Sequence, residues 1–253
     1  MCLIIFAHRT APQYPLLVAA NRDEFHARPT AASGFWRDQP GLLAGKDLEQ
    51  GGTWMGITRS GRFAAVTNYR DPSRTAPAPR SRGGLTLDFL TGSLPPQAYL
   101  EQIAASAGEY AGFNLLLGDR QGLWYFSNSC PGPRELEPGI YGLSNARLDT
   151  AWPKVETGKK SLAGALCREI DHQQLATAVS DRLIASLEDL DRHGLGGDME
   201  QLLSAQFIVN EFYGTRATTT LLVDSDDNAY WRELSFNGGG METGRVELDF
   251  SLE

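Results

Sequence analysis

The sequence predicts an α+β layered domain in which helices pack outside antiparallel β-sheets. Short apolar runs rich in β-branched residues occur at the start, middle and end of the chain, as buried strands require. Two stretches between them change to the three- and four-residue spacing of helices. The resulting order of strands, helices, strands, helices and strands is typical of a layered α+β fold. Because no internal repeat or clear linker interrupts the chain, we expect one domain over residues 1–253.

The first strands come in pairs. Residues 2–7 are apolar and β-branched in the middle, which predicts a buried strand. Residues 15–20 form a second apolar run, and it ends at the polar cluster of residues 21–24. Residues 53–58 and 63–67 flank Ser60-Gly61 and predict a hairpin. Two adjacent strands, one of them ending in charged residues, are typical of a sheet edge that presents a site.

The middle of the chain predicts two helices and then three strands. Residues 85–90 have helical spacing, and Pro96 stands where a second helix would begin. Residues 113–117 and 123–126 return to a strand pattern across a glycine-bounded turn, and residues 139–143 form another short strand.

The last third of the chain predicts a mostly helical region followed by a final set of strands. Residues 162–203 place apolar side chains at helical steps, with glycines interrupting the pattern near position 195. Strands are expected at residues 218–223, 230–236 and 245–250.

Composition excludes several classes of protein. The net charge of −8 argues against a nucleic-acid partner, which would need a basic surface. Only residues 70–82 concentrate basic side chains, and their prolines predict a solvated loop. The sequence lacks an apolar run long enough to span a membrane, and residues 1–7 lack a basic leader. We therefore expect a cytoplasmic protein without a membrane span.

The cysteines and histidines do not form a metal pattern. Three cysteines are an odd number without paired spacing, which favours neither a disulfide framework nor a zinc site. Four histidines occur, at positions 8, 26, 172 and 193, and none falls into a metal-ligand motif. We expect no metal and no cofactor, and the sequence does not predict an oligomeric state.

Cys2 is the residue most typical of a catalytic nucleophile. Removal of Met1 would leave one residue that carries both a thiol and a free α-amine. The pKa of an α-amine is near 8 and that of a thiol near 8.5, so the amine is suited to act as the base of its own thiol. The same amine is suited to protonate the leaving nitrogen of an amide. The alternative is that Cys2 simply begins a buried core strand.

Polar residues at the ends of other predicted strands would complete such a site. Arg22 and Asp23 follow the second strand, where they would lower the thiol pKa and hold the ammonium form of the amine. Asn68 and Asn145 each close a strand and are suited to donate to an oxyanion. Arg216 precedes the strand at 218–223 and would add positive charge. Each of these residues fits an ordinary turn or surface position equally well.

Several segments resemble the NRDE family, also called the transport-and-Golgi-organisation 2 family. The resemblance spans nearly the whole chain. It rests on Ala20-Asn21-Arg22-Asp23-Glu24-Phe25, Arg28-Pro29-Thr30, Gly52-Thr53-Trp54-Met55-Gly56, Ala65-Val66-Thr67-Asn68-Tyr69-Arg70, Gly142-Leu143-Ser144-Asn145, Leu148-Asp149-Thr150-Ala151-Trp152-Pro153-Lys154-Val155 and Arg216-Ala217-Thr218-Thr219-Thr220.

That family in turn resembles the penicillin V acylase and bile salt hydrolase group of N-terminal nucleophile hydrolases, which implies a four-layer αββα sandwich. The hydrolase group separates its arginine and aspartate by two residues, whereas here they are adjacent, so one side chain is free to point elsewhere, with Asn21 or Glu24 as substitutes. The resemblance implies Cys2 as the nucleophile, Arg22 and Asp23 as its partners, Asn68 and Asn145 around the oxyanion, and Arg216 nearby.

Two functions follow as expectations. The first is a cysteine amidohydrolase that cleaves a small linear or acylated amide. The second is a binding or carrier protein, since similar proteins have been tied to haem handling, acyl-CoA and lipid metabolism and Golgi organisation. In that case the aromatic residues Phe25, Trp36, Trp54 and Tyr69 would line an apolar pocket for haem or an acyl-CoA, with His8, His26 or Cys2 as candidate iron ligands. A structural or interaction protein without a small-molecule site is the third reading.

Overall fold

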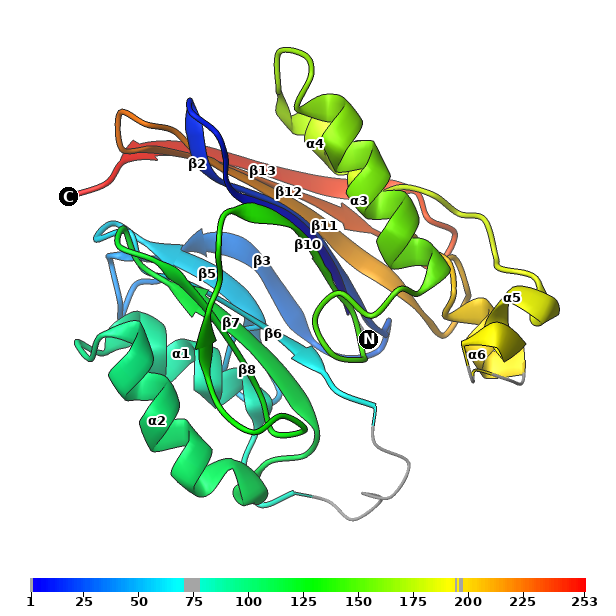
Figure 1. Ribbon diagram of the computed structural model, residues 1–253, viewed down its shortest axis with the longest axis horizontal. Coiled ribbons are helices and arrows are strands. Elements are labelled where there is room, and N and C mark those ends of the chain that lie inside the picture. The colour runs from blue at the N-terminus through cyan, green and yellow to red at the C-terminus, as the bar shows by residue number, and fades with distance from the viewer. Residues whose placement is uncertain (1, 71–77, 194, 196–197) are drawn as a thin grey trace.

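The computed structural model describes residues 2–70, 78–193, 195 and 198–253. Within these ranges, two antiparallel sheets lie face to face, and helices cover their outer faces (Figure 1). The first sheet has the strand order β10-β1-β2-β11-β12-β13, and the second has the order β3-β4-β5-β6-β7-β8-β9. The predicted four-layer αββα sandwich is confirmed.

The first sheet joins the two ends of the chain, because its strands come from the N-terminal segment, the middle and the C-terminal segment. Its strands are β1 (Cys2–Ala11), β2 (Tyr14–Phe25), β10 (Gly139–Leu143), β11 (Tyr213–Val223), β12 (Asn228–Phe236) and β13 (Glu242–Ser251).

The second sheet is built from the middle of the chain. Its strands are β3 (Thr30–Phe35), β4 (Leu42–Asp47), β5 (Met55–Thr58), β6 (Phe63–Asn68), β7 (Phe113–Gly118), β8 (Leu123–Ser127) and the short β9 (Arg134–Glu135).

The helices form the two outer layers and one end of the molecule (Figure 1). No helix in the described ranges has both the length and the apolar content needed to cross a bilayer. The helices are α1 (Arg82–Thr91), α2 (Pro96–Ser106) with the 3₁₀ turn Ala107–Glu109, α3 (Pro153–Ala165), α4 (His172–Ala176) with the 3₁₀ turn Thr177–Val179, α5 (Leu187–Arg192) and α6 (Asp198–Leu202).

Three apolar layers hold the sandwich together, and the period-2 alternation of the strands sorts side chains among them. On β1, Ile4 and Phe6 point into the core between the sheets, whereas Leu3 and Ile5 pack under α3 and α4. A third cluster, around Phe89, lies between the second sheet and helices α1 and α2. Even-numbered residues of β1 therefore face the sheet interface and odd-numbered residues face the helices.

Two sequence predictions need correction. Strand β2 does not end at residue 20: it continues through Asn21 and Asp23 to Phe25, because β1 pairs with it on one side and β11 on the other. The region 162–203 is not one helical stretch. Only short helices form there, and Leu183 and Ile184, which fit the helical spacing, are exposed. Residues 71–77 of the predicted basic loop lie outside the described residues.

Candidate active site

Cys2 lies at the start of β1, directly opposite Arg22 of β2 in the antiparallel register. Its even position directs the thiol toward the second sheet, and the side chain is half-buried. The backbone N–H of Asp23 hydrogen-bonds the sulfur. Because residues pair in opposite directions, the peptide nitrogen of Cys2 lies opposite the step from Arg22 to Asp23. The register therefore brings three of the predicted site residues together.

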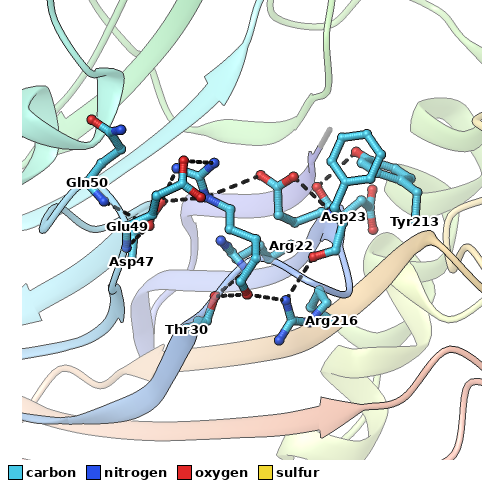
Figure 2. Close-up of polar contacts among 11 residues, drawn as sticks. Arg22, Asp23, Thr30, Asp47, Glu49, Gln50, Tyr213 and Arg216 are labelled. Carbon is cyan, nitrogen blue, oxygen red and sulfur yellow. Dashed lines mark hydrogen bonds and ion pairs between the residues drawn. The ribbon is translucent and has the colours of Figure 1, made fainter.

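Arg22 and Asp23 point to opposite faces of the first sheet. The Arg22 guanidinium lies 4.2 Å from the centre of the Trp54 ring. Its Nη1 donates to Thr30 Oγ1 at 3.2 Å (Figure 2). Asp23 points toward the helix layer, where its Oδ1 accepts a hydrogen bond from Thr215 Oγ1 at 2.7 Å. Adjacent residues of a strand point to opposite faces, so the two side chains separate. This agrees with the expectation that one of them points elsewhere than in the hydrolase group.

Asn21 shares the outer face with Asp23 and has a structural position. Its Nδ2 donates to the carbonyls of Val179 and Gln206 at 2.7 and 2.8 Å, and its Oδ1 accepts from Thr218 Oγ1 at 2.7 Å. These bonds satisfy the buried amide and tie the centre of the sheet to the segments that cover it. Asn21 therefore does not substitute for Asp23 at the thiol.

Lys154 is a buried charged residue beside this site to which the sequence analysis assigned no role. It lies in the first turn of α3, is only 5% exposed, and its Nζ donates to the Leu203 carbonyl at 2.7 Å. The carboxylate of Asp23 and the sulfur of Cys2 are its main electrostatic partners. The sequence feature that could have pointed to Lys154 is its place in the apolar motif Trp152-Pro153-Lys154-Val155. Lysine in such a setting is seldom buried without a partner.

Burial and neighbouring charges have opposing effects on the pKa values of Cys2, Asp23 and Lys154. Burial raises the pKa of the Cys2 thiol, and the Asp23 carboxylate raises it further, whereas Arg22 lowers it. Burial also raises the pKa of Asp23, against the opposing effects of Lys154 and Arg22. Burial lowers the pKa of Lys154. The two cations therefore offset part of the cost of a charged carboxylate and thiolate in a partly desolvated site.

Asn68 and Asn145 meet where β6 and β10 end. Asn145 is buried, and its Nδ2 donates to the backbone carbonyl of Asn68 at 2.8 Å. The side chain of Asn68 is exposed to the same cavity as Cys2. Ser144, next in the chain to Asn145, donates from its hydroxyl to the Cys2 carbonyl at 3.1 Å. The ends of three strands are thus joined around Cys2.

Arg216 is the bulged residue of β11, at the register shift between Thr215 and Ala217. Its Nη1 donates to the carbonyls of Phe25 and Arg28 at 3.0 and 2.8 Å, so it holds the end of β2 (Figure 2). Arg216 does not line the cavity that contains Cys2. The structure therefore places it near the site but against the backbone.

A cavity of about 460 Å³ opens beside Cys2. Its walls come from β2, the turn after β4, the end of β6 and the start of α1, and most of them are polar. Residues that line it include Cys2, Arg22, Asp23, Glu24, Arg28, Asp47, Glu49, Trp54, Asn68, Arg80 and Arg82. Among these lining residues, Arg28 pairs with Asp47 at 2.8 Å and with Glu49 at 3.3 Å.

Comparison with known proteins identifies the family. The sequence profile of the family Transport and Golgi organisation 2 matches residues 1–238. The Transport and Golgi organization protein 2 homologs of Bos taurus and Homo sapiens are 36% and 35% identical to this chain, and the alignments cover 94% and 93% of both chains, respectively. The chain belongs to the Transport and Golgi organisation 2 family. The Drosophila melanogaster protein is 27% identical over 99% of both chains.

Solved structures similar to this Transport and Golgi organisation 2 chain are N-terminal nucleophile hydrolases. A mutant of the conjugated bile acid hydrolase from Clostridium perfringens matches with a TM-score of 0.59 at 8% identity, covering 99% of this chain and 92% of the other. The Caenorhabditis elegans ortholog of N-acylethanolamine-hydrolyzing acid amidase matches with a TM-score of 0.54 at 10% identity, covering 87% and 92%. At these identities the likeness establishes a hydrolase-like fold.

The expectation that four aromatic residues of this Transport and Golgi organisation 2 chain line an apolar pocket is wrong. Trp54 lines the cavity, but Trp36 packs under α1 in the outer core, and Phe25 is 59% exposed. Strand alternation and the long β2 send these side chains to different layers. Within the described ranges, histidine, cysteine and acidic side chains do not gather into a group of three or more that would hold a metal ion.

Proposed function

We propose that this protein is an N-terminal cysteine amidohydrolase that cleaves a linear, non-peptide or acylated amide after removal of Met1. The main support is the pairing of Cys2 with Arg22, which turns the thiol toward the cavity and sets the position of the α-amine opposite Asp23. Met1 itself lies outside the described residues. The proposal keeps one domain over residues 1–253, no cofactor and a cytoplasmic location.

The chemistry follows from the two groups of Cys2. The amine of Cys2 takes the thiol proton, and the sulfur attacks the amide carbonyl to form a C–S bond and an oxyanion. The C–N bond then breaks, the ammonium of Cys2 protonates the leaving nitrogen, and a thioester remains. Water attacks the thioester, releases the carboxylic acid and restores the thiol. The net reaction consumes one amide and one water and yields one acid and one amine.

The surrounding residues have distinct roles in this proposal. Asp23 holds the ammonium form of the Cys2 amine, and Arg22 favours the thiolate. Asn68, whose side chain reaches the cavity, supplies the amide donor to the oxyanion. Asn145 holds the backbone of Asn68 in place, and Arg216 holds the end of β2.

The carrier function for haem or an acyl-CoA gains no specific support from the cavity. Its walls are mainly polar, and four arginines and four acidic residues line it. The apolar part of such a ligand would desolvate these groups, which costs free energy. The enzyme is therefore the function that we propose.

Trapping of the acyl group on Cys2 tests this function. The mature protein would be mixed with a panel of activated acyl esters and acyl anilides and followed by intact mass and peptide mapping. We expect one acyl group per chain on Cys2, which water then removes, and none in Cys2→Ala. Thermal melting would show that the variant is folded. Equal release of the leaving group by folded Cys2→Ala would contradict the proposal.

A further inference from the structure

Two guanidinium groups line the cavity beside Cys2 without an ion pair to a carboxylate within 4.0 Å among the described residues. Arg22 reaches it from β2 and Arg82 from the first residue of α1. We propose that Arg22 and Arg82 form a subsite for an anionic group of the substrate, close to the carbonyl that Cys2 attacks. This inference rests on the proposed function and names its substrate class: an amide that carries a small oxyanion such as a carboxylate or a phosphate.

The other cavity arginines are already neutralised. Arg28 pairs with Asp47 and Glu49, and Glu24 lies 4.0 Å away. Arg80 lies 3.4 Å from Glu109 and 4.0 Å from Asp88. The wall around Arg28 therefore carries more negative than positive charge and would repel an anion.

Arg22 and Arg82 differ from these two residues. Arg22 stacks on Trp54 and donates to the neutral hydroxyl of Thr30. Arg82 is half-buried and donates to the carbonyl of Gly112 at 3.2 Å. Neither contact neutralises the charge of its guanidinium. A buried or half-buried cation without a carboxylate in direct contact is costly, and an anionic ligand would offset part of that cost.

The position of Arg82 places the subsite near the nucleophile. The Cys2 sulfur is the largest favourable electrostatic influence on the Arg82 guanidinium, which burial otherwise disfavours. Ser81, Arg82 and Gly83 all line the cavity, so the positive end of α1 also faces it, and the first turn of α1 contains no acidic residue. The two guanidinium groups would thus attract an anion into the cavity that Cys2 lines.

Alkylation by two reagents of similar shape tests the subsite. Iodoacetate carries a carboxylate where iodoacetamide carries a neutral amide, and both alkylate thiolates. The ratio of their rates at Cys2 would be measured in the mature full-length protein and divided by the same ratio at the exposed Cys167, which corrects for intrinsic reactivity. We expect Cys2 to favour iodoacetate by about fivefold after this correction.

Variants and competitors assign that preference to Arg82. Arg82→Gln should remove most of the preference, and Arg82→Lys should keep it. Arg120→Gln, which removes an exposed arginine paired with Asp227, should leave it unchanged. Salt at about 1 M should reduce the preference in the wild type, because the screening length falls to about 3 Å. Acetate and inorganic phosphate would compete separately, and the stronger competitor identifies the kind of oxyanion.

The outcomes separate this inference from the proposed function. Rapid alkylation of Cys2 by iodoacetamide without any preference for iodoacetate would overturn the subsite and leave the nucleophile in place. The same preference in folded Arg82→Gln as in the wild type would also overturn it. A Cys2 that resists both reagents would contradict both the subsite and the proposed function. Loss of the preference in Arg82→Gln, with retention in Arg82→Lys, would support the subsite.

Discussion

The side chains of neighbouring residues in a strand point into different layers of this molecule. Arg22 points between the sheets to Trp54, and Asp23 points to the helix layer, where Thr215 donates to it. Cys2 pairs with Arg22 yet remains close enough to Asp23 for that carboxylate to raise its pKa. A site of this kind depends on register, because a slip of one residue would exchange the two faces.

Lys154 is expected to tune the reactivity of Cys2. Replacing it with methionine removes a buried cation that favours both the thiolate of Cys2 and the carboxylate of Asp23. The pKa of the Cys2 thiol should rise, so alkylation at neutral pH should slow about tenfold. The measurement is the pH dependence of the alkylation rate in the mature protein.

A second lysine provides the control for that experiment. Lys159→Met lies on the same helix but removes a partly exposed ion pair with Asp149, so its pH profile should match the wild type. Lys154→Arg should retain most of the reactivity because it keeps the charge. An unchanged profile in folded Lys154→Met would show that the lysine only fills space.

At the scale of elements, the turn after β4 passes against the start of α1. A Cβ atom on Gly52 would lie 2.5 Å from the backbone carbon of Gly83, and Thr53 N–H donates to the Gly83 carbonyl at 3.3 Å. Only glycine allows this approach, which sets the distance between α1 and the cavity. Arg82, which we place in the anion subsite, stands next to this contact.

Gly52→Ala is therefore expected to displace α1 and to destabilise the protein by about 1–3 kcal/mol. The iodoacetate preference of Cys2 should fall at the same time, because Arg82 moves with the helix. Urea unfolding and the alkylation ratio provide the two measurements. Gly164→Ala in α3 is the matched control: its new methyl group meets nothing within 4 Å, so stability should stay level or rise. A Gly52→Ala protein as stable as the wild type would refute the close-packing argument.

A buried glutamate links the two sheets at another element contact. Glu233 of β12 accepts hydrogen bonds from Ser33 of β3, from its N–H at 2.8 Å and its hydroxyl at 2.6 Å. Burial raises the pKa of Glu233 in the folded protein. The protonated form therefore favours folding below the unfolded pKa of about 4.5, and this contribution is lost as the pH rises through the folded pKa.

Glu233→Gln should remove this pH dependence. Relative to the wild type, the variant should gain about 1 kcal/mol of stability as the pH rises from about 4.5 to 7, because an amide does not ionise. Unfolding in urea at a series of pH values measures the difference, with exposed Glu247→Gln of β13 as the control. A difference that stays constant with pH would contradict the buried-carboxyl argument.

The elements also show what the sequence could predict. Apolar runs and helical spacing located the strands of the first sheet, β5 to β8 of the second sheet, and helices α1 and α2, because local burial determines those patterns. Strands β3, β4 and β9 of the second sheet were not predicted. Sequence could not predict that β2 continues through Asn21 and Asp23. Polar residues fit the centre of that sheet only because partners far along the chain, such as Gln206 and Thr215, satisfy them. Arg82 was missed for a similar reason, since contacts between distant segments, such as that of Gly52 with Gly83, bring α1 to the cavity.

At the scale of the whole molecule, acid should weaken the first sheet. His8 of β1 is buried, and burial lowers its pKa to about 4. A depressed histidine pKa favours folding above the unfolded value of about 6.5, and this contribution is lost as the pH falls toward 4. His8→Leu should therefore lose less stability than the wild type between those pH values. Melting temperatures across this range test it, with exposed His193→Leu as the control. Parallel losses in His8→Leu and the wild type would assign acid sensitivity to other groups.

The whole molecule places the first residue of its first strand inside a four-layer sandwich, beside a polar cavity. The most direct test of that arrangement is the intact mass of the purified protein before and after brief treatment with iodoacetamide near neutral pH, with the labelled residue mapped by digestion. We predict that Met1 is absent and that Cys2 is labelled faster than Cys130 and Cys167. A protein that retains Met1, or a folded protein whose Cys2 is labelled more slowly than both other cysteines, would contradict the claim that Cys2 is the nucleophile.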